Sequence, residues 1–237
     1  MSDTREAFVE SLFDGIAPVY DRMNRVMTFG LYDLWQGVLM RLAAPAQGEV
    51  ALDVASGTAD LAIHLARRVG ERGRVTGLDL SQGMLSVGRR KVAAQGLADR
   101  ITLVEGNALA LPFEDDTFDL AVVGFGLRNM SDVPAAIAEM RRVVRPGGRV
   151  LSLEMSHPKG VLTAPLFHLY FDHLVPYVGA LGGRGKRPYE WLPASLREFP
   201  DRERLEKIFL DAGLVNIFSK PLAAGSVAIH RGLVARP

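Results

Sequence analysis

The stretch "EVALDVASGTADLAIHLARRVG" (residues 49–70) decides the fold. Its first part, 49–56, is a short apolar run typical of a strand buried on both faces, and its last part, 59–70, has the periodicity of a helix that ends at Gly70. A short loop with a single glycine, Gly57, joins the two. The stretch therefore predicts the first strand and the first helix of a parallel sheet.

The same alternation continues along the chain. Two periodic segments predict helices that begin near Ser81 and near Ser131 or Asp132, and the second is expected to stop at Pro146-Gly147-Gly148. Further apolar runs predict strands at 74–81, 100–106, 118–126 and 149–156, and a closing hairpin of 214–220 with 226–235. We therefore expect an α/β fold with a doubly wound, mostly parallel seven-stranded sheet that ends in an antiparallel hairpin strand.

Composition narrows the class of protein. The chain has 237 residues, a formal net charge of +1 and no cysteine, so there is no electrostatic argument for nucleic acid and no disulfide or thiolate chemistry. The N-terminus lacks the apolar core of a signal peptide, and a cytoplasmic protein is expected. Residues 1–45 are predicted to be a helical extension of the main domain, 46–237.

Polar residues follow three of the predicted strands, at the edge where parallel sheets bind ligands. The loop that begins at Asp53 and contains Gly57 is not the G-x-G-x-x-G loop of a dinucleotide site, which disfavours a nicotinamide-dependent dehydrogenase. Asp79, after the second strand, is placed to accept both hydroxyls of a ribose. Asn107 and Ala108, after the third strand, would lie beside an adenine.

This set of residues resembles the Rossmann-like class I methyltransferases that use S-adenosylmethionine. That cofactor carries a sulfonium and an amino group and no phosphate, so a carboxylate near the loop favours its binding. The resemblance implies that the cofactor is held by Asp53, Gly57, Thr58, Asp79, Asn107, Ala108 and Gly124.

A closer resemblance lies outside the cofactor loop and covers about residues 8–232. The segments that carry it are "YDRMNRVMTFGLYDLW" (20–35), "GFGLRNMSD" (124–132), "RVVRPGGRVLSLEMSHP" (142–158) and "AAGSVAIHRG" (223–232). They resemble the menaquinone/ubiquinone biosynthesis C-methyltransferase family. The resemblance implies methyl transfer to a ring carbon of a prenylated quinol. The naphthoquinol demethylmenaquinol is favoured over a benzoquinol precursor of ubiquinone, because the sequence ends soon after "HRG" and shows no targeting extension, as in compact bacterial members of the family.

The sequence departs from the family pattern in the cofactor loop and in the outer substrate contacts. Ala59 stands where the family usually has a second loop glycine, and an alanine there carries a steric cost if its φ is positive. Thr28 and Gly124 replace family serines, and Tyr32-Asp33 replaces a His-Arg pair.

Methyl transfer from a sulfonium requires an aligned and electron-rich acceptor carbon. Arg128 stays protonated and is predicted to stabilise a developing phenolate, and Asn129 to hold a quinol oxygen or a water. Asp21 is a candidate acceptor of the quinol proton. Tyr20 and Asn24, on the same helical turn, are predicted substrate contacts together with Tyr189. The alternative for Arg128 is a salt bridge that holds the following helix.

The segment 160–183 is apolar, but Asp172 and two prolines argue against a membrane-spanning helix. Within a predicted acceptor-side insertion, 157–200, it suits an isoprenoid tail, and contact with the inner face of the cytoplasmic membrane or a homodimer face is expected from the same apolarity. No pair of histidines has metal-ligand spacing with a supporting acid, so no metal is predicted.

Two other readings remain open at this stage. A methyltransferase for another small apolar acceptor would share the cofactor loop, but it gives no reason for "YDRMN" together with "FGLRN". A non-catalytic binding subunit of a quinone-assembly complex is disfavoured because Thr58, Asp79 and Arg128 are intact.

Overall fold

The computed structural model describes residues 2–175 and 187–236, with the side chains of 2–4, 172–174 and 187–189 outside the description. Its sheet has seven strands in the order β3-β2-β1-β4-β5-β7-β6. The strands are β1 (Val50–Val54), β2 (Arg74–Asp79), β3 (Ile101–Glu105), β4 (Phe118–Gly124), β5 (Val144–Met155), β6 (Leu214–Leu222) and β7 (Val227–Val234). Strands β1 to β5 pair in parallel, and β7 runs antiparallel to both β5 and β6. The predicted fold is confirmed, including the closing hairpin.

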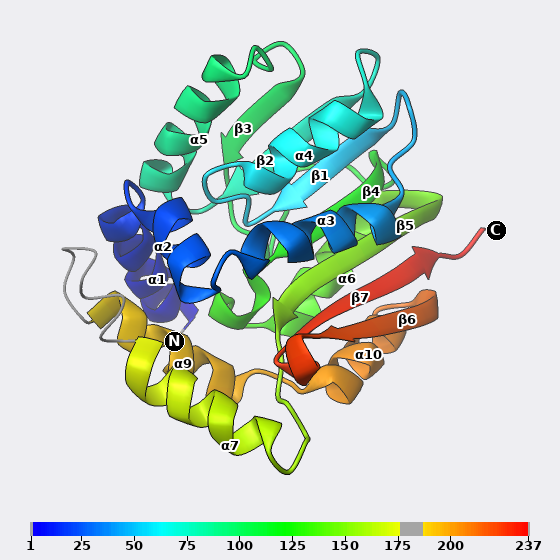
Figure 1. Cartoon of the computed structure of the whole chain (residues 1–237). Helices are drawn as coiled ribbons and strands as arrows, with labels where there is room; N and C mark the ends of the chain where they lie inside the picture. Colours follow the sequence, from blue (N-terminus) through cyan, green and yellow to red (C-terminus); the bar gives the residue numbers. More distant parts are fainter. Residues whose placement is uncertain (1, 176–186, 237) are drawn as a thin grey trace.

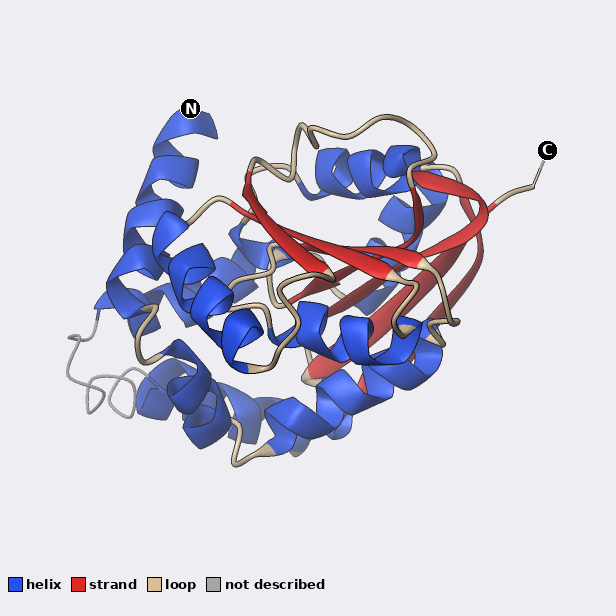
Figure 2. Cartoon of the chain, turned by 90° about the horizontal axis from the view of Figure 1, so that it is seen from above, coloured by secondary structure: helices blue, strands red, loops and turns tan. Residues whose placement is uncertain are grey.

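Helices cover both faces of the sheet (Figures 1 and 2). One face packs against α3 (Leu31–Ala43), α4 (Asp60–Val69) and part of α5 (Gln82–Ala94), and the other against α6 (Val133–Val143) and α10 (Arg202–Asp211). The remaining helices are α1 (Ser2–Ile16), α2 (Tyr20–Met27), α7 (Thr163–His168), the π-helical η2 (Leu169–Leu174), α9 (Arg187–Glu198) and the short 3-10 turns η1 (Leu127–Asn129) and η3 (Ala223–Gly225). Figure 1 shows α1, α2, α7 and α9 gathered at one end of the molecule, by the carboxyl ends of the strands.

Local sequence signals set several helix ends. The Ser81 hydroxyl accepts the Met84 N–H and caps α5, Asp132 caps α6 in the same way, and Gly70 ends α4 at a positive φ. The predicted end of α6 was wrong, because the helix stops at Val143 and not at the Pro-Gly-Gly. Val144 already pairs with Phe118 in β4, so sheet pairing ends the helix early and the Pro-Gly-Gly lies in an irregular start of β5.

The loop after β1 has an unusual backbone. Ala55, Gly57 and Ala59 have φ values of 53°, 53° and 68°, so the positive φ considered for residue 59 is confirmed. An L-residue in this left-handed region costs about 1–2 kcal/mol. The Ala59 methyl is fully buried, which offsets part of that cost. The alternating positive φ values turn the chain sharply from the strand into α4.

We therefore expect Ala59→Gly to change the free energy of unfolding by less than about 1 kcal/mol, because relief of the positive φ offsets the loss of a buried methyl. Ala62→Gly is the matched control, since Ala62 is equally buried but lies inside α4. It should cost about 2 kcal/mol, from the lost methyl and the poor helix propensity of glycine. Urea unfolding measures both. Equal losses in the two variants would show that the positive φ stores no strain.

Candidate active site

A pocket lies at the carboxyl ends of β1 to β4 and is called here the strand-end pocket. The strand order reverses between β1 and β4, which is where open α/β sheets bind their ligands. Five of the seven predicted cofactor residues line it: Gly57, Asp79, Asn107, Ala108 and Gly124. Helix α1 closes it from the opposite side with Glu6, Val9 and Phe13.

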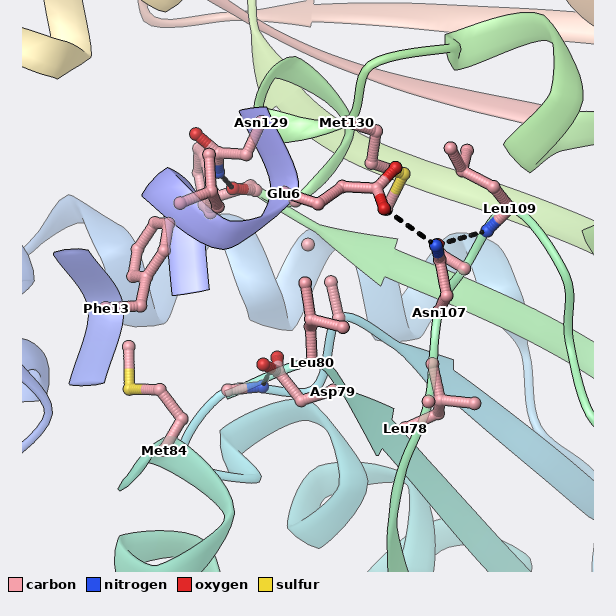
Figure 3. Close-up of a pocket in the computed structure, with 18 of the residues that line it drawn as sticks. Glu6, Phe13, Leu78, Asp79, Leu80, Met84, Asn107, Leu109, Asn129 and Met130 are labelled. Carbon is pink, nitrogen blue, oxygen red and sulfur yellow. Dashed lines mark hydrogen bonds between the residues drawn. The ribbon is translucent and has the colours of Figure 1, made fainter. Parts of the chain in front are cut away.

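Asp79 supplies a carboxylate to this pocket. Its two oxygens accept the backbone N–H groups of Gly57, at 2.8 Å, and Ser81, at 2.9 Å. Burial raises the pKa of Asp79, and these N–H donors act in the opposite direction. Each carboxylate oxygen has a second acceptor site, so the group can still bind a diol. Figure 3 shows the Asp79 carboxyl beside Leu80, at the floor of the pocket.

Asn107 marks the other end of the strand-end pocket. Its Oδ1 accepts the Leu109 N–H at 2.9 Å, and its Nδ2 donates to Glu6 Oε2 at 3.1 Å (Figure 3). Sequence reasoning missed Glu6. The spacing of Glu6, Val9 and Phe13 along one helical face was a signal that could have placed all three in one pocket.

Two predicted cofactor residues, Asp53 and Thr58, do not line the strand-end pocket. Asp53 is fully buried beneath the loop, and its carboxyl oxygens have no hydrogen-bond partner within the described part of the chain. Burial raises its pKa well above the ordinary value. The Thr58 hydroxyl turns away from the pocket and donates to Asp21 Oδ1 at 2.5 Å. Its expected side-chain contact with a cofactor therefore has no geometric support.

Thr58 belongs to a polar cluster that joins four segments. Lys91 of α5 binds Asp21 Oδ2 of α2 at 2.6 Å, Asp60 Oδ1 of α4 at 2.5 Å and Thr58 Oγ1 at 3.1 Å. Asp21 lines neither the strand-end pocket nor the second pocket described below. The geometry therefore favours a structural role for Asp21 over that of a proton acceptor. Lys91 was not singled out from the sequence, because nothing local shows that α5 faces α2.

A second pocket, called here the apolar pocket, adjoins the first and has a volume of ≈ 240 Å³. Tyr20 and Phe125 line both pockets and so mark where they meet. The Tyr32 ring stacks on Phe125 at 5.6 Å between centroids. Other lining residues come from α2, the turn after it, α3, the end of β5 and the helices that follow β5: Asn24, Met27, Phe29, Trp35, Met155, Phe167, Tyr170, Phe171 and Leu192.

Arg128 lines the apolar pocket and is 6 % exposed. One guanidinium nitrogen, Nη1, donates to Glu154 Oε1 at 2.5 Å and to the Phe125 carbonyl at 2.8 Å. Glu154, on β5, is also buried. The Nε–H of Arg128 is buried and has no partner among the described residues. A salt bridge therefore exists, but it joins Arg128 to strand β5 and not, as the sequence alternative had it, to the following helix, and a donor of the same side chain is left over.

The remaining predicted site residues are Asn24, Asn129 and Tyr189, and the first two do not share one pocket. Asn24 lines the apolar pocket, and Asn129 lines the strand-end pocket. The Asn129 Oδ1 accepts the Trp191 indole N–H at 2.9 Å, and its Nδ2 donates to the Phe125 carbonyl at 3.3 Å. Tyr189 belongs to α9, and its side chain lies outside the described residues.

Neither a metal site nor a membrane-spanning helix is found among the described residues. No group of three or more histidine, aspartate or glutamate side chains could hold a metal ion there. None of the described helices combines the length and the apolarity needed to cross a bilayer.

The chain matches the model of the ubiE/COQ5 methyltransferase family over residues 1–234. Curated relatives include the demethylmenaquinone methyltransferase of Bacillus subtilis strain 168, 42 % identical over 98 % of this chain and 99 % of that protein. The protein of the same name from Halalkalibacterium halodurans is 41 % identical over 98 % of this chain and 95 % of that one.

Solved structures share the fold at low sequence identity. An S-adenosylmethionine-dependent methyltransferase from Aquifex aeolicus has a TM-score of 0.62 and 17 % identity, over 89 % of this chain and 93 % of that one. The [4+2]-cyclase SpnF has a TM-score of 0.72 and 17 % identity, over 97 % and 96 % of the two chains.

The residues of the strand-end pocket fit S-adenosylmethionine. The pocket offers one carboxylate to a ribose diol, an amide to a base edge and apolar walls from Leu78, Leu80 and Met130. It has no lysine or arginine among its described lining residues, as suits a cofactor that carries a sulfonium and no phosphate. The chain is thus an S-adenosylmethionine-dependent methyltransferase, and it belongs to the ubiE/COQ5 methyltransferase family.

Proposed function

We propose that this enzyme methylates a ring carbon of a prenylated quinol, and that demethylmenaquinol is the acceptor. The observation that carries the proposal is the meeting of the strand-end pocket with a large apolar pocket at Tyr20 and Phe125. A cofactor in the first would present its reactive group to a ring in the second. The curated relatives named demethylmenaquinone methyltransferase support a naphthoquinol over a benzoquinol.

The cofactor, when bound, supplies an electrophilic methyl group on a positively charged sulfur. Asp79 would hold its ribose, and Asn107 and Ala108 would lie beside its base. Methyl transfer to the acceptor carbon would leave the electron pair of the broken carbon–sulfur bond on the cofactor's sulfur. The acceptor carbon then loses its hydrogen as a proton. What this chain must do is exclude water, align the ring and make the carbon electron-rich.

The apolar pocket is suited to aligning a ring but not to taking its proton. Its described lining contains no carboxylate and no imidazole, and its ionisable groups are Arg128 and three tyrosines. Burial raises the pKa of Tyr20, Tyr32 and Tyr170, so these hydroxyls stay protonated and do not act as bases. The Tyr170 hydroxyl already donates to the Met27 carbonyl at 2.6 Å. Because none of the described lining residues is a base, we infer that the quinol proton leaves through water.

Arg128 is proposed to stabilise the phenolate oxygen that makes the ring electron-rich. Glu154 neutralises much of its charge, so the useful feature is the unpartnered Nε–H and not a free cation. A buried donor without a partner costs about 1–3 kcal/mol, and an anionic oxygen in the pocket would remove that cost. Glu154 also fixes the guanidinium, which avoids reorganisation during the reaction.

An open groove continues from the apolar pocket toward the surface. The two share Phe167, Tyr170, Ala223 and Ser226. Around the groove lie exposed apolar side chains, called here the apolar rim: Phe29, Val161, Leu162, Leu166 and Leu169. We propose that the isoprenoid tail leaves along the groove and that the rim contacts the inner face of the cytoplasmic membrane, where such an acceptor resides. A homodimer stays a prediction from the sequence.

The direct test is methyl transfer from labelled S-adenosylmethionine to a panel of reduced acceptors. We expect the prenylated naphthoquinol to be methylated on carbon with the highest kcat/KM, and the benzoquinol precursor more slowly. Preference for the benzoquinol would reassign the acceptor. Labelling of neither quinol, with cofactor binding intact, would refute the proposed function and favour a different apolar acceptor.

Arg128→Lys tests the proposed phenolate contact. The lysine can still pair with Glu154, but it has no Nε–H fork. We expect turnover to fall about tenfold to a hundredfold, with unchanged affinity for S-adenosylhomocysteine.

The control for Arg128→Lys is the melting temperature. Arg128→Ala is not a clean substitute, because an unpaired buried Glu154 would cost about 3–5 kcal/mol of stability. The charge-neutral pair Arg128→Gln with Glu154→Gln completes the series. Normal turnover per folded molecule in both Arg128→Lys and the pair would leave only the structural role.

The double variant Leu162→Ser with Leu166→Ser tests the apolar rim. Each buried leucine side chain favours an apolar environment by about 1.5–3 kcal/mol, so binding to phospholipid vesicles should weaken tenfold or more. Turnover of a long-tailed quinol in vesicles should fall with it, while a short-tailed quinol in solution reacts normally. Leu210→Ser with Val215→Ser, also exposed but on α10 and β6, is the matched control. Equal vesicle binding by both double variants would contradict the membrane contact.

A further inference from the structure

The strand-end pocket has a second carboxylate, on the helix that closes it. Glu6 and Asp79 are the acidic residues among its described lining, and Glu6 comes from α1. Its Oε2 accepts Asn107 Nδ2 at 3.1 Å, and its Oε1 accepts the Ser131 hydroxyl at 3.0 Å. Figure 3 shows the Glu6 side chain reaching across the pocket to Asn107. The family resemblance that located the other cofactor residues gave no role to this one.

The position of Glu6 matches one edge of the cofactor's base. Asn107 follows β3 and lies where the adenine is expected, between the apolar side chains of Leu78, Leu109 and Met130. A carboxylate has about four acceptor sites, and the two hydrogen bonds of Glu6 leave about half of them open. Adenine carries one strong exocyclic donor, its 6-amino group. A partly satisfied carboxylate beside Asn107 is a suitable acceptor for it.

We propose that the Glu6 carboxylate accepts a hydrogen bond from the 6-amino group of the adenine. This contact makes the enzyme selective for adenine over hypoxanthine in its cofactor. With hypoxanthine the amino group is replaced by a carbonyl oxygen, which would place an acceptor against the carboxylate. Asn107 positions Glu6 through its Nδ2–H. The proposal rests on S-adenosylmethionine as cofactor and does not depend on which quinol is the acceptor.

A purely structural role for Glu6 makes a different prediction. Helix α1 also crosses to the other side of the pocket, where Asp14 Oδ1 accepts the Ser81 hydroxyl at 2.5 Å and the Gly83 N–H at 2.8 Å. Glu6 could be the second tether of the same helix and nothing more. Loss of a tether would weaken any ligand under α1 by the same factor, whatever its base. Loss of a base contact would weaken only the adenine ligand.

The test is calorimetric binding of S-adenosylhomocysteine and of its 6-oxo analogue S-inosylhomocysteine. The wild type should prefer the adenine ligand by about tenfold to a hundredfold, the worth of one charge-assisted hydrogen bond. In Glu6→Gln the preference should fall to about threefold or less, because the amide can accept from an amino group or donate to a carbonyl. Glu10→Gln, one turn further along α1 and outside the pocket lining, should keep the full preference.

Two further measurements keep the result unambiguous. Asp79→Asn should weaken both ligands together, because the ribose is the same in each. Amide hydrogen exchange of α1 should slow with S-adenosylhomocysteine more than with the 6-oxo analogue in the wild type, and equally with both in Glu6→Gln. Equal binding of the two ligands by the wild type, or an unchanged preference in Glu6→Gln, would overturn the proposal and leave Glu6 as a tether.

Discussion

Three carboxylates hold the N-terminal helices against the strand ends, and both pockets depend on them. Glu6 and Asp14 fasten α1 across the strand-end pocket, and Asp21 fastens α2 to Lys91. Without these contacts the pocket at the sheet edge would be an open crevice. Tyr20, at the start of α2, would not stand between the cofactor and the apolar pocket. The carboxyl ends of the strands form one side of the site. Helices α1 and α2, held in place by these polar contacts, cover the other side.

The sheet itself could be predicted because its signals are local. Continuous apolar runs mark the buried parallel strands, and the polar residues that follow them, such as Asp79 and Asn107, can go only to the sheet edge. The contacts of Asp21 and Glu6 could not be predicted, because they depend on how helices far apart in sequence meet. The sequence predicted that Asp21 faces the acceptor site with Tyr20 and Asn24, but its side chain instead binds Lys91, which is 70 residues away. The end of α6 was missed for a similar reason, since pairing of Val144 with β4 overrides the local stop signal.

The structure keeps Arg128 in the proposed site but changes the role that the sequence predicts for it. From the sequence it is a fixed cation at the end of a strand. In the structure its charge is matched by Glu154, and what remains is a buried Nε–H without a partner among the described residues, on a side chain that lines the apolar pocket. A lone cation close to a sulfonium would repel the cofactor at low effective dielectric. A neutral ion pair avoids that repulsion, and in the proposed reaction its remaining N–H would donate to the developing phenolate.

The site is formed by the sheet edge and by helices that cover it, and this explains why the fold alone does not specify the reaction. A [4+2]-cyclase shares this architecture at 17 % identity, so the strand edge by itself is compatible with different chemistry. In this chain α1, α2 and the segment after β5 supply much of the lining of the apolar pocket and the cover of the cofactor site. Because α1 and α2 are joined by only three residues, movement of α1 would also displace α2. Closing α1 over a cofactor would therefore also set Tyr20 at the junction, which couples cofactor binding to the shape of the acceptor site.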